Sequence, residues 1–264
     1  MRLVLVLVLF TASVAAQVPA VVPVSSPAGA ALPWHGRADI IADFMRTAPI
    51  GRIEDIPVGV TKPRRALLTA EGPIASVVVK DLRPGRKSGY WESYQSEIAA
   101  YELDRMLDLN MVPPTVERRV NGTLMSAQMF VERCVWLKEL SAERPPNVEA
   151  WNRQVHRQRV FDNLIANIDR NAGNLLVYRT PEWHLVLIDH SRCFTSTKKM
   201  PFEMTKIDRP LFDKLKALDK ASLEARLGKL LVDGVDSLLA RRDAIVKHFE
   251  RLAASKGDAQ VFIP

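Results

Sequence analysis

The sequence contains few cysteines, and none of its cysteines or histidines has a metal-binding spacing. Of 264 residues, two are cysteines, Cys134 and Cys193, and neither belongs to a C-x-x-C pair. The five histidines show no H-x-x-x-H spacing. These absences argue against a zinc ribbon and against a thioredoxin-type motif. For the cysteines they leave two alternatives, a disulfide between them or two free thiols.

Long apolar runs are absent beyond the N-terminal end, so we expect no other segment to span a bilayer. The first sixteen residues, MRLVLVLVLFTASVAA, contain a basic residue, a short apolar core and small residues up to Ala16. This order is typical of a secretory signal peptide, which we predict over residues 1–16. The core falls short of the about 20 residues that a transmembrane helix needs, although an uncleaved anchor remains the alternative. We therefore expect an exported protein, either secreted, periplasmic or in the lumen of the secretory pathway.

A concentrated basic region is also absent. The formal charge is +7 and the pI is near 9.5, but lysine and arginine are spread along the chain without a long basic run. The charge therefore gives little support to a nucleic-acid partner, and we predict none. With 47% hydrophobic and 25% charged residues, the composition is that of an ordinary globular protein, which excludes the disordered and collagen-like classes.

The chain after the signal divides into three regions. Residues 17–36 carry four prolines among small residues, which predicts an unpacked linker. Residues 37–135 are rich in strand patterns, with one hairpin around Glu71-Gly72-Pro73, a helix over 93–109, and a second hairpin at Asn121-Gly122. Residues 136–264 favour helix, beginning with a long apolar face from Asn147 to Ile168. A short strand pair follows that face, and the last third is helical again.

The stretch LIANIDRNAGNLLV, residues 164–177, places a polar loop between an apolar helix and an apolar strand. Asp169 and Asn174 lie five residues apart in this loop, and Asp189 follows at the end of the next apolar strand. Phosphoryl transfer needs a carboxylate to orient the attacking hydroxyl and oxygen ligands to hold Mg²⁺ or Mn²⁺. Protein kinases present these groups in this order. We predict Asp169 as the base, and Asn174 and Asp189 as metal ligands.

The first half of the chain supplies matching parts. Lys80 ends the apolar strand SVVVK, where it would bind the nucleotide phosphates, and Glu97 begins a helix seventeen residues later. Glu97 would orient Lys80, although Glu102 competes for this role. We predict that Met129 and Val131 lie in the strand that enters the hinge between the lobes, where backbone groups would contact adenine. We also predict phosphate contacts at the Glu71-Gly72 turn, although it lacks a G-x-G-x-x-G pattern.

The sequence resembles the secretory-pathway kinases of the Golgi, the family that includes the casein kinase, the xylosyl kinase and Four-jointed. The resemblance covers roughly residues 75–195 and is carried by SEIAAYELDRMLDLNMVPPTVERRVNG, FDNLIANIDRNAGNLLV and HLVLIDHSRCF. It implies a helix glutamate at Glu97, the proline pair Pro113-Pro114, a catalytic Asp169 and a metal-binding Asp189. More distant phosphatidylinositol kinases and HipA-type kinases share a D-R-x-x-x-N loop, which residues 169–174 match.

The chain departs from the Golgi enzymes at several points. It has Asn171 where they have histidine, Ser191 where they have glycine, and two cysteines where they carry several disulfides. The resemblance therefore supports the fold and the nucleotide chemistry more than any particular acceptor.

Together these patterns predict an α+β, two-lobed protein-kinase-like fold with ATP and Mg²⁺ or Mn²⁺ between the lobes. The predicted activity is phosphoryl transfer to a hydroxyl of a protein or glycan. Two alternatives stay open: nucleotidyl transfer in the same cleft, and a pseudokinase that binds nucleotide without turnover.

Overall fold

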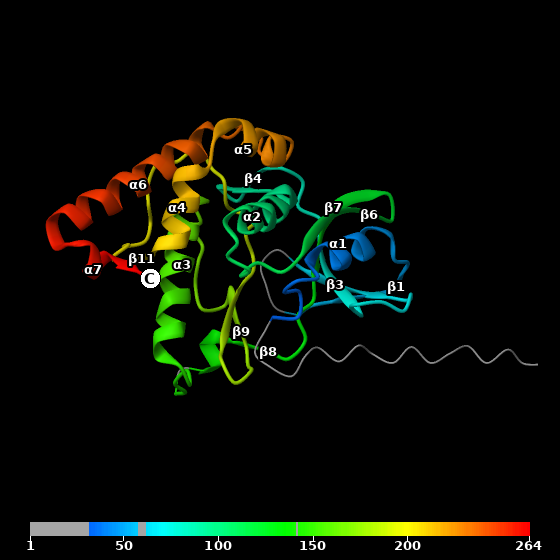
Figure 1. Ribbon diagram of the computed structural model, residues 1–264. Coiled ribbons are helices and arrows are strands. Elements are labelled where there is room, and N and C mark those ends of the chain that lie inside the picture. Colours follow the sequence, from blue (N-terminus) through cyan, green and yellow to red (C-terminus); the bar gives the residue numbers. More distant parts are fainter. Residues whose placement is uncertain (1–31, 58–61, 141) are drawn as a thin grey trace, which may run out of the picture.

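The computed structural model describes residues 32–57, 62–140 and 142–264. The predicted signal peptide and residues 17–31 of the predicted linker lie outside these ranges. Figure 1 shows a lobe built around an antiparallel sheet and a larger, mostly helical lobe. The fold is α+β and two-lobed, as predicted.

The smaller lobe is built on a five-stranded sheet with the order β1-β2-β3-β7-β6 and antiparallel neighbours throughout. Its strands are β1 (Ile50–Asp55), β2 (Arg64–Leu68), β3 (Ser76–Lys80), β6 (Thr115–Val120) and β7 (Thr123–Met129). Both predicted hairpins are present. In the second, Asn121 and Gly122 both have positive φ, as a tight two-residue hairpin turn requires. Strand β1 was not predicted, because its half-buried residues show no regular alternation.

The helix α1 (Ala38–Thr47) packs on this sheet beside β6. The residues just before it correct the prediction of an unpacked linker up to residue 36. Leu32 and Trp34 are buried in the core of the small lobe, and the Trp34 side chain is only 1% exposed. Proline content argued against a helix here, but one indole buries enough apolar surface to fix a short turn against the sheet.

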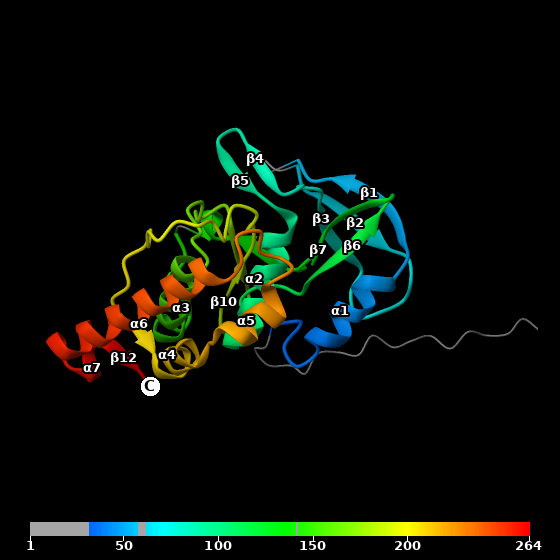
Figure 2. The ribbon, with the colours of Figure 1, turned by 90° about the horizontal axis from the view of Figure 1, so that it is seen from above.

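Helix α2 (Tyr94–Leu107) lies between the two lobes and begins at Ser93, whose hydroxyl caps the first turn. Just before it, the sequence forms an unpredicted hairpin of β4 (Gly85–Lys87) and β5 (Tyr90–Glu92). Figure 2 shows this hairpin projecting away from the five-stranded sheet. Glu92, at the end of this hairpin, accepts hydrogen bonds from Arg192 of the larger lobe.

The larger lobe contains the largest apolar core, which α2 shares. Its elements are β8 (Cys134–Trp136), a 3₁₀ turn (Leu137–Leu140), α3 (Val148–Leu164), β9 (Leu175–Tyr178), β10 (His184–Leu187), β11 (Ile207–Asp208), α4 (Arg209–Ala217), α5 (Lys220–Leu227), α6 (Asp236–Lys256), α7 (Asp258–Val261) and β12 (Phe262–Ile263). Strands β8, β9 and β10 form one small sheet. Helix α3 ends at Leu164, four residues before the predicted end of its apolar face, so Ile168 lies in the following loop and is 54% exposed.

No helix in the part of the chain that the structure describes is long and apolar enough to cross a bilayer. The two cysteines are free thiols, Cys193 buried and Cys134 half-buried, which decides between the two alternatives that the sequence left open.

Candidate active site

The centre of the site is a buried ion-pair network that joins the two lobes. Lys80 at the end of β3 donates a hydrogen bond from Nζ to Glu97 Oε1 of α2 at 2.5 Å. It donates a second to Asp189 Oδ1, just after β10, at 2.7 Å. The sequence predicted all three residues for one site. Glu102, the competing residue, instead pairs with Arg226 on α5.

Burial and pairing act against each other in this network. Burial by itself lowers the pKa of Lys80, but the charges of Glu97 and Asp189 outweigh it and raise that pKa above its usual value. Burial likewise raises the pKa of Glu97, yet the Lys80 ammonium and the His190 side chain hold it well below the usual range. The His190 backbone N–H also donates to Glu97 Oε2, at 3.0 Å. Both groups are therefore charged in the folded protein.

The loop after α3 presents Asp169 and Asn174 together. The Asn174 amide donates from Nδ2 to the Asp169 carbonyl oxygen at 2.9 Å, which directs its side-chain oxygen elsewhere. The Asp169 backbone N–H donates to Asn167 Oδ1, and its carboxylate is 42% exposed. Asp169 is thus held by its backbone while its carboxylate stays accessible.

The buried side chain of Arg170 holds this loop in place. Arg170 pairs through Nε with Asp162 of α3 at 2.9 Å. Its Nη1 donates to the carbonyl oxygens of Asn174 at 2.7 Å and Ile188 at 2.8 Å. Its Nη2 lies 3.0 Å from His190 Nε2. Arg170 therefore ties the Asp169 loop to the segment that carries Asp189.

A cavity of about 220 Å³ opens beside this network. It is lined by Lys80, Asn174 and Asp189, by the predicted residues Met129 and Val131, and by Ile56, Pro63, Val78, Gln128, Phe130, Cys134, Trp136, Gly173, Leu176 and Ile188. One end is polar and the other is mostly apolar. This combination suits a ligand with a charged group and a flat apolar ring.

The prediction of phosphate contacts at the Glu71-Gly72 turn is not supported by the structure. This turn joins β2 to β3 and does not line the cavity. A Cβ on Gly72 would lie 2.2 Å from the Phe44 ring of α1, so this glycine allows close packing of α1. The residues that line the cavity instead are Ile56 and Pro63, in the connection between β1 and β2. Strand β1 was not predicted, so the connection between β1 and β2 was not considered. The first turn that the sequence analysis identified was therefore the one between β2 and β3.

The sequence analysis missed several residues of the site, and only some of them had a sequence signal. Val78 lies two residues before Lys80 and Leu176 two residues after Asn174, so strand alternation could have placed both in the cavity. Arg192 had no comparable signal. Its Nη1 lies 3.1 Å from Asp169 Oδ2, and its Nη2 lies 2.8 Å from Glu92 Oε1 of β5.

The donor set fits a divalent cation of the Mg²⁺ or Mn²⁺ type. The Asp189 carboxylate and the Asn174 side-chain oxygen are hard oxygen donors at the polar end of the same cavity. Such ions are commonly bound by one or two protein groups, with phosphate oxygens and water completing the shell.

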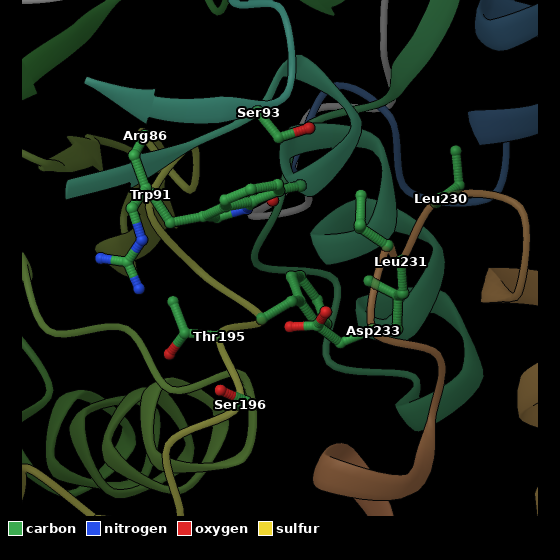
Figure 3. Close-up of a pocket in the computed structure, with 11 residues that line it drawn as sticks. Arg86, Trp91, Ser93, Thr195, Ser196, Leu230, Leu231 and Asp233 are labelled. Atoms are coloured by element: carbon green, nitrogen blue, oxygen red, sulfur yellow. The ribbon is translucent and has the colours of Figure 1, made fainter.

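A second, smaller pocket of about 70 Å³ lies beside β5 and is lined in part by Trp91. Figure 3 shows the Trp91 indole lying across it, with Arg86 on one side, Leu231 and Asp233 on the other, and Thr195 and Ser196 below. The segment that follows Asp189 thus borders both the cleft and this pocket.

Comparison with solved structures identifies the fold. The chain is similar to the solved structure of the Golgi casein kinase with Mn/ADP bound, with a TM-score of 0.67 and 14% identity over 87% of this chain and 79% of that chain. It is also similar to the structure of hydra Fam20 with sugar, with a TM-score of 0.64 and 16% identity over 89% of this chain and 99% of that chain. The Helicobacter pylori proinflammatory kinase CtkA gives a TM-score of 0.54 and 12% identity over 80% of this chain and 98% of that chain. At these identities the likeness establishes the protein-kinase-like fold, and at that level confirms the resemblance to the Golgi kinases.

The sequence comparison identifies the family. The family model "Phosphatidylinositol 3- and 4-kinase" matches residues 52–257, which is most of the chain. The chain therefore belongs to this family. Phosphatidylinositol 4-kinase gamma 4 of Oryza sativa subsp. japonica is 29% identical over a region covering 53% of this chain. The chain spans about a quarter (26%) of the length of that relative.

Proposed function

We propose that this protein is an exported, ATP-dependent and divalent-metal-dependent kinase that phosphorylates a hydroxyl group of a protein or glycan. The observation that carries the proposal is the buried contact of Lys80 with both Glu97 and Asp189 at the polar end of a cavity. In kinases, a Lys–Glu ion pair together with a metal-binding Asp binds and orients the nucleotide phosphates.

Each residue has a defined role in the proposed reaction. Lys80, held by Glu97, binds the phosphates of ATP. Asp189 and Asn174 would hold a divalent metal ion, which would supply positive charge against those phosphates. Asp169 orients the acceptor hydroxyl. The acceptor oxygen bonds to the γ-phosphorus, the bond to the β,γ-bridging oxygen breaks with its electrons leaving on ADP, and the hydroxyl proton passes to Asp169.

The apolar end of the cavity would receive adenine between Val78 and Leu176. The Met129 backbone N–H already donates to the Pro114 carbonyl oxygen at 2.8 Å, and the Phe130 N–H donates to Ser76. Val131, which lines the same cavity, is therefore our choice for the backbone group that recognises the adenine edge.

Export rests on residues 1–16 and agrees with a Golgi casein kinase among the similar structures. The protein or glycan acceptor rests on the structural likeness to that enzyme and to hydra Fam20 with sugar. Family membership favours a second candidate acceptor, the inositol hydroxyl of a phosphatidylinositol lipid.

The test is incubation of the purified protein with γ-labelled ATP, Mn²⁺ or Mg²⁺, and three acceptor pools. These are secreted proteins, glycans, and vesicles containing phosphatidylinositol. Labelled product with an added mass of about 80 daltons is expected for phosphoryl transfer. Addition of a whole nucleotide would instead establish nucleotidyl transfer. Nucleotide binding without product in any pool would establish the pseudokinase alternative.

A further inference from the structure

Arg192 connects the catalytic loop to the β4–β5 hairpin. It follows Asp189 by three residues, and its side chain is only 17% exposed. Its Nε and Nη2 both donate to Glu92 Oε1, at 3.0 and 2.8 Å, and Nη1 donates to Asp169 Oδ2 at 3.1 Å. The guanidinium also lies over the Tyr90 ring, 4.5 Å from its centre. Three groups from two separate segments thus determine its position.

The guanidinium fork explains why an arginine suits this place. A planar fork donates to one carboxylate along one edge and still offers Nη1 to a second, whereas a lysine ammonium has no such fixed geometry. Glu92 is buried and anchors the fork, while Asp169 is partly accessible at its other end. The anchored end therefore fixes the direction from which Nη1 approaches the catalytic carboxylate.

The catalytic loop itself contributes little to orient this carboxylate. Asn171, two residues after Asp169, accepts from the Gly173 N–H at 2.8 Å and donates to the Asp169 carbonyl oxygen at 2.9 Å. Asn174 also donates to that carbonyl oxygen. These contacts fix the backbone of Asp169, and the contact to its carboxylate comes from Arg192.

We propose that Arg192 is a positioning residue for phosphoryl transfer, which holds the Asp169 carboxylate in the orientation that accepts the acceptor's hydrogen bond. This inference rests on the proposed function. The β4–β5 hairpin contributes to this positioning, because its residues Tyr90 and Glu92 contact the Arg192 guanidinium and hold it in place. Trp91 lies between them and, by strand alternation, lines the pocket on the opposite face of β5.

The substitution Arg192→Gln tests the inference in single-turnover transfer from labelled ATP and in ATP hydrolysis without acceptor. The rate of the chemical step should fall roughly 100-fold, because misplacing a catalytic group by about 1 Å costs that much. The KM for ATP should stay within about twofold, since Arg192 does not line the nucleotide cavity. Free guanidinium ion should partly restore the rate of Arg192→Ala and leave the wild-type rate unchanged.

Two further variants separate positioning from folding. Glu92→Gln keeps Arg192 and Asp169 but weakens the anchor, so it should cause a smaller fall in the same rate. Arg83→Gln removes an exposed charge just before β4 and should change nothing. Thermal unfolding of every variant shows whether it is folded.

The outcomes are distinguishable. Transfer at the wild-type rate by folded Arg192→Gln would overturn the positioning role and leave the proposed function standing. A lower rate with a raised KM for ATP and no guanidinium rescue would also overturn it. Failure of the wild-type protein to transfer phosphate or hydrolyse ATP would overturn the proposed function and this inference together.

Discussion

Asp189 Oδ1 lies 2.7 Å from Lys80 Nζ, although the two residues are 109 positions apart in the chain. One closes a strand in the small lobe and the other follows a strand in the large lobe. This contact fixes the polar end of the cavity by connecting the lobes there, and each substitution in it should therefore affect both stability and nucleotide binding.

Lys80→Met should destabilise the fold as well as abolish transfer. It leaves the Glu97 carboxylate, 2% exposed, without its ammonium partner. Removing one partner of a buried pair typically costs about 3–5 kcal/mol in free energy of unfolding. Urea denaturation measures this cost. The double variant Lys80→Met/Glu97→Gln should recover part of it, and additive losses would show that the two charges are not coupled.

Asp189→Ala should abolish metal-dependent nucleotide binding. The remaining Asn174 oxygen is too weak a site for a hard divalent cation without a carboxylate beside it. Titration calorimetry with ATP, in Mn²⁺ and then in EDTA, checks the effect. Asp81→Ala removes an exposed carboxylate next to Lys80 and provides the control. Unchanged metal-dependent affinity in a folded Asp189→Ala protein would show that the metal is held elsewhere.

Asp169→Asn should separate catalysis from binding. The substitution keeps the shape of the side chain but removes the charge that accepts the hydroxyl proton. Transfer should fall by about 100-fold or more, since a positioned base contributes about 10² to 10⁴ in rate. ATP affinity should stay unchanged, because Asp169 does not line the nucleotide cavity. Single-turnover transfer and calorimetry measure the two effects, and equal transfer rates would remove Asp169 from the mechanism.

Asp104 should make the stability of the fold depend on pH. Burial raises the pKa of this carboxyl to about 7, even though its Oδ1 accepts backbone N–H groups from Met111 and Val112. The folded protein then holds a proton that the unfolded chain, with a pKa near 3.8, releases. The stabilisation that this group contributes is therefore complete below pH 4 and is lost as the pH rises toward 7.

The shift corresponds to roughly 4 kcal/mol at about 1.4 kcal/mol per pKa unit. Asp104→Asn keeps an oxygen acceptor for both backbone groups and cannot titrate. Urea denaturation from pH 4 to pH 8 measures the unfolding free energy of both proteins. As the pH rises, wild type should lose stability relative to Asp104→Asn. Parallel curves for the two proteins would contradict the assignment.

The sequence determined the parts of the site whose signals are local. The spacing of Asp169, Asn174 and Asp189 follows from one loop and one strand pair, and Lys80 and Glu97 from a strand end and a helix start. Periodicity was sufficient for these elements, because apolar alternation and helical faces are properties of short segments. The same reasoning failed at Gly72, since a turn pattern does not show which strands stand beside it.

Only the tertiary structure decided which of these groups meet. Glu97 and Glu102 are equivalent by sequence, and packing of α2 between the lobes turned the first toward Lys80 and the second toward Arg226. Trp34 read as part of an unpacked linker until its burial showed otherwise. Arg192 reaches Asp169 and Glu92 across 23 and 100 residues of chain. Such contacts depend on how distant segments fold together, which local spacing cannot encode.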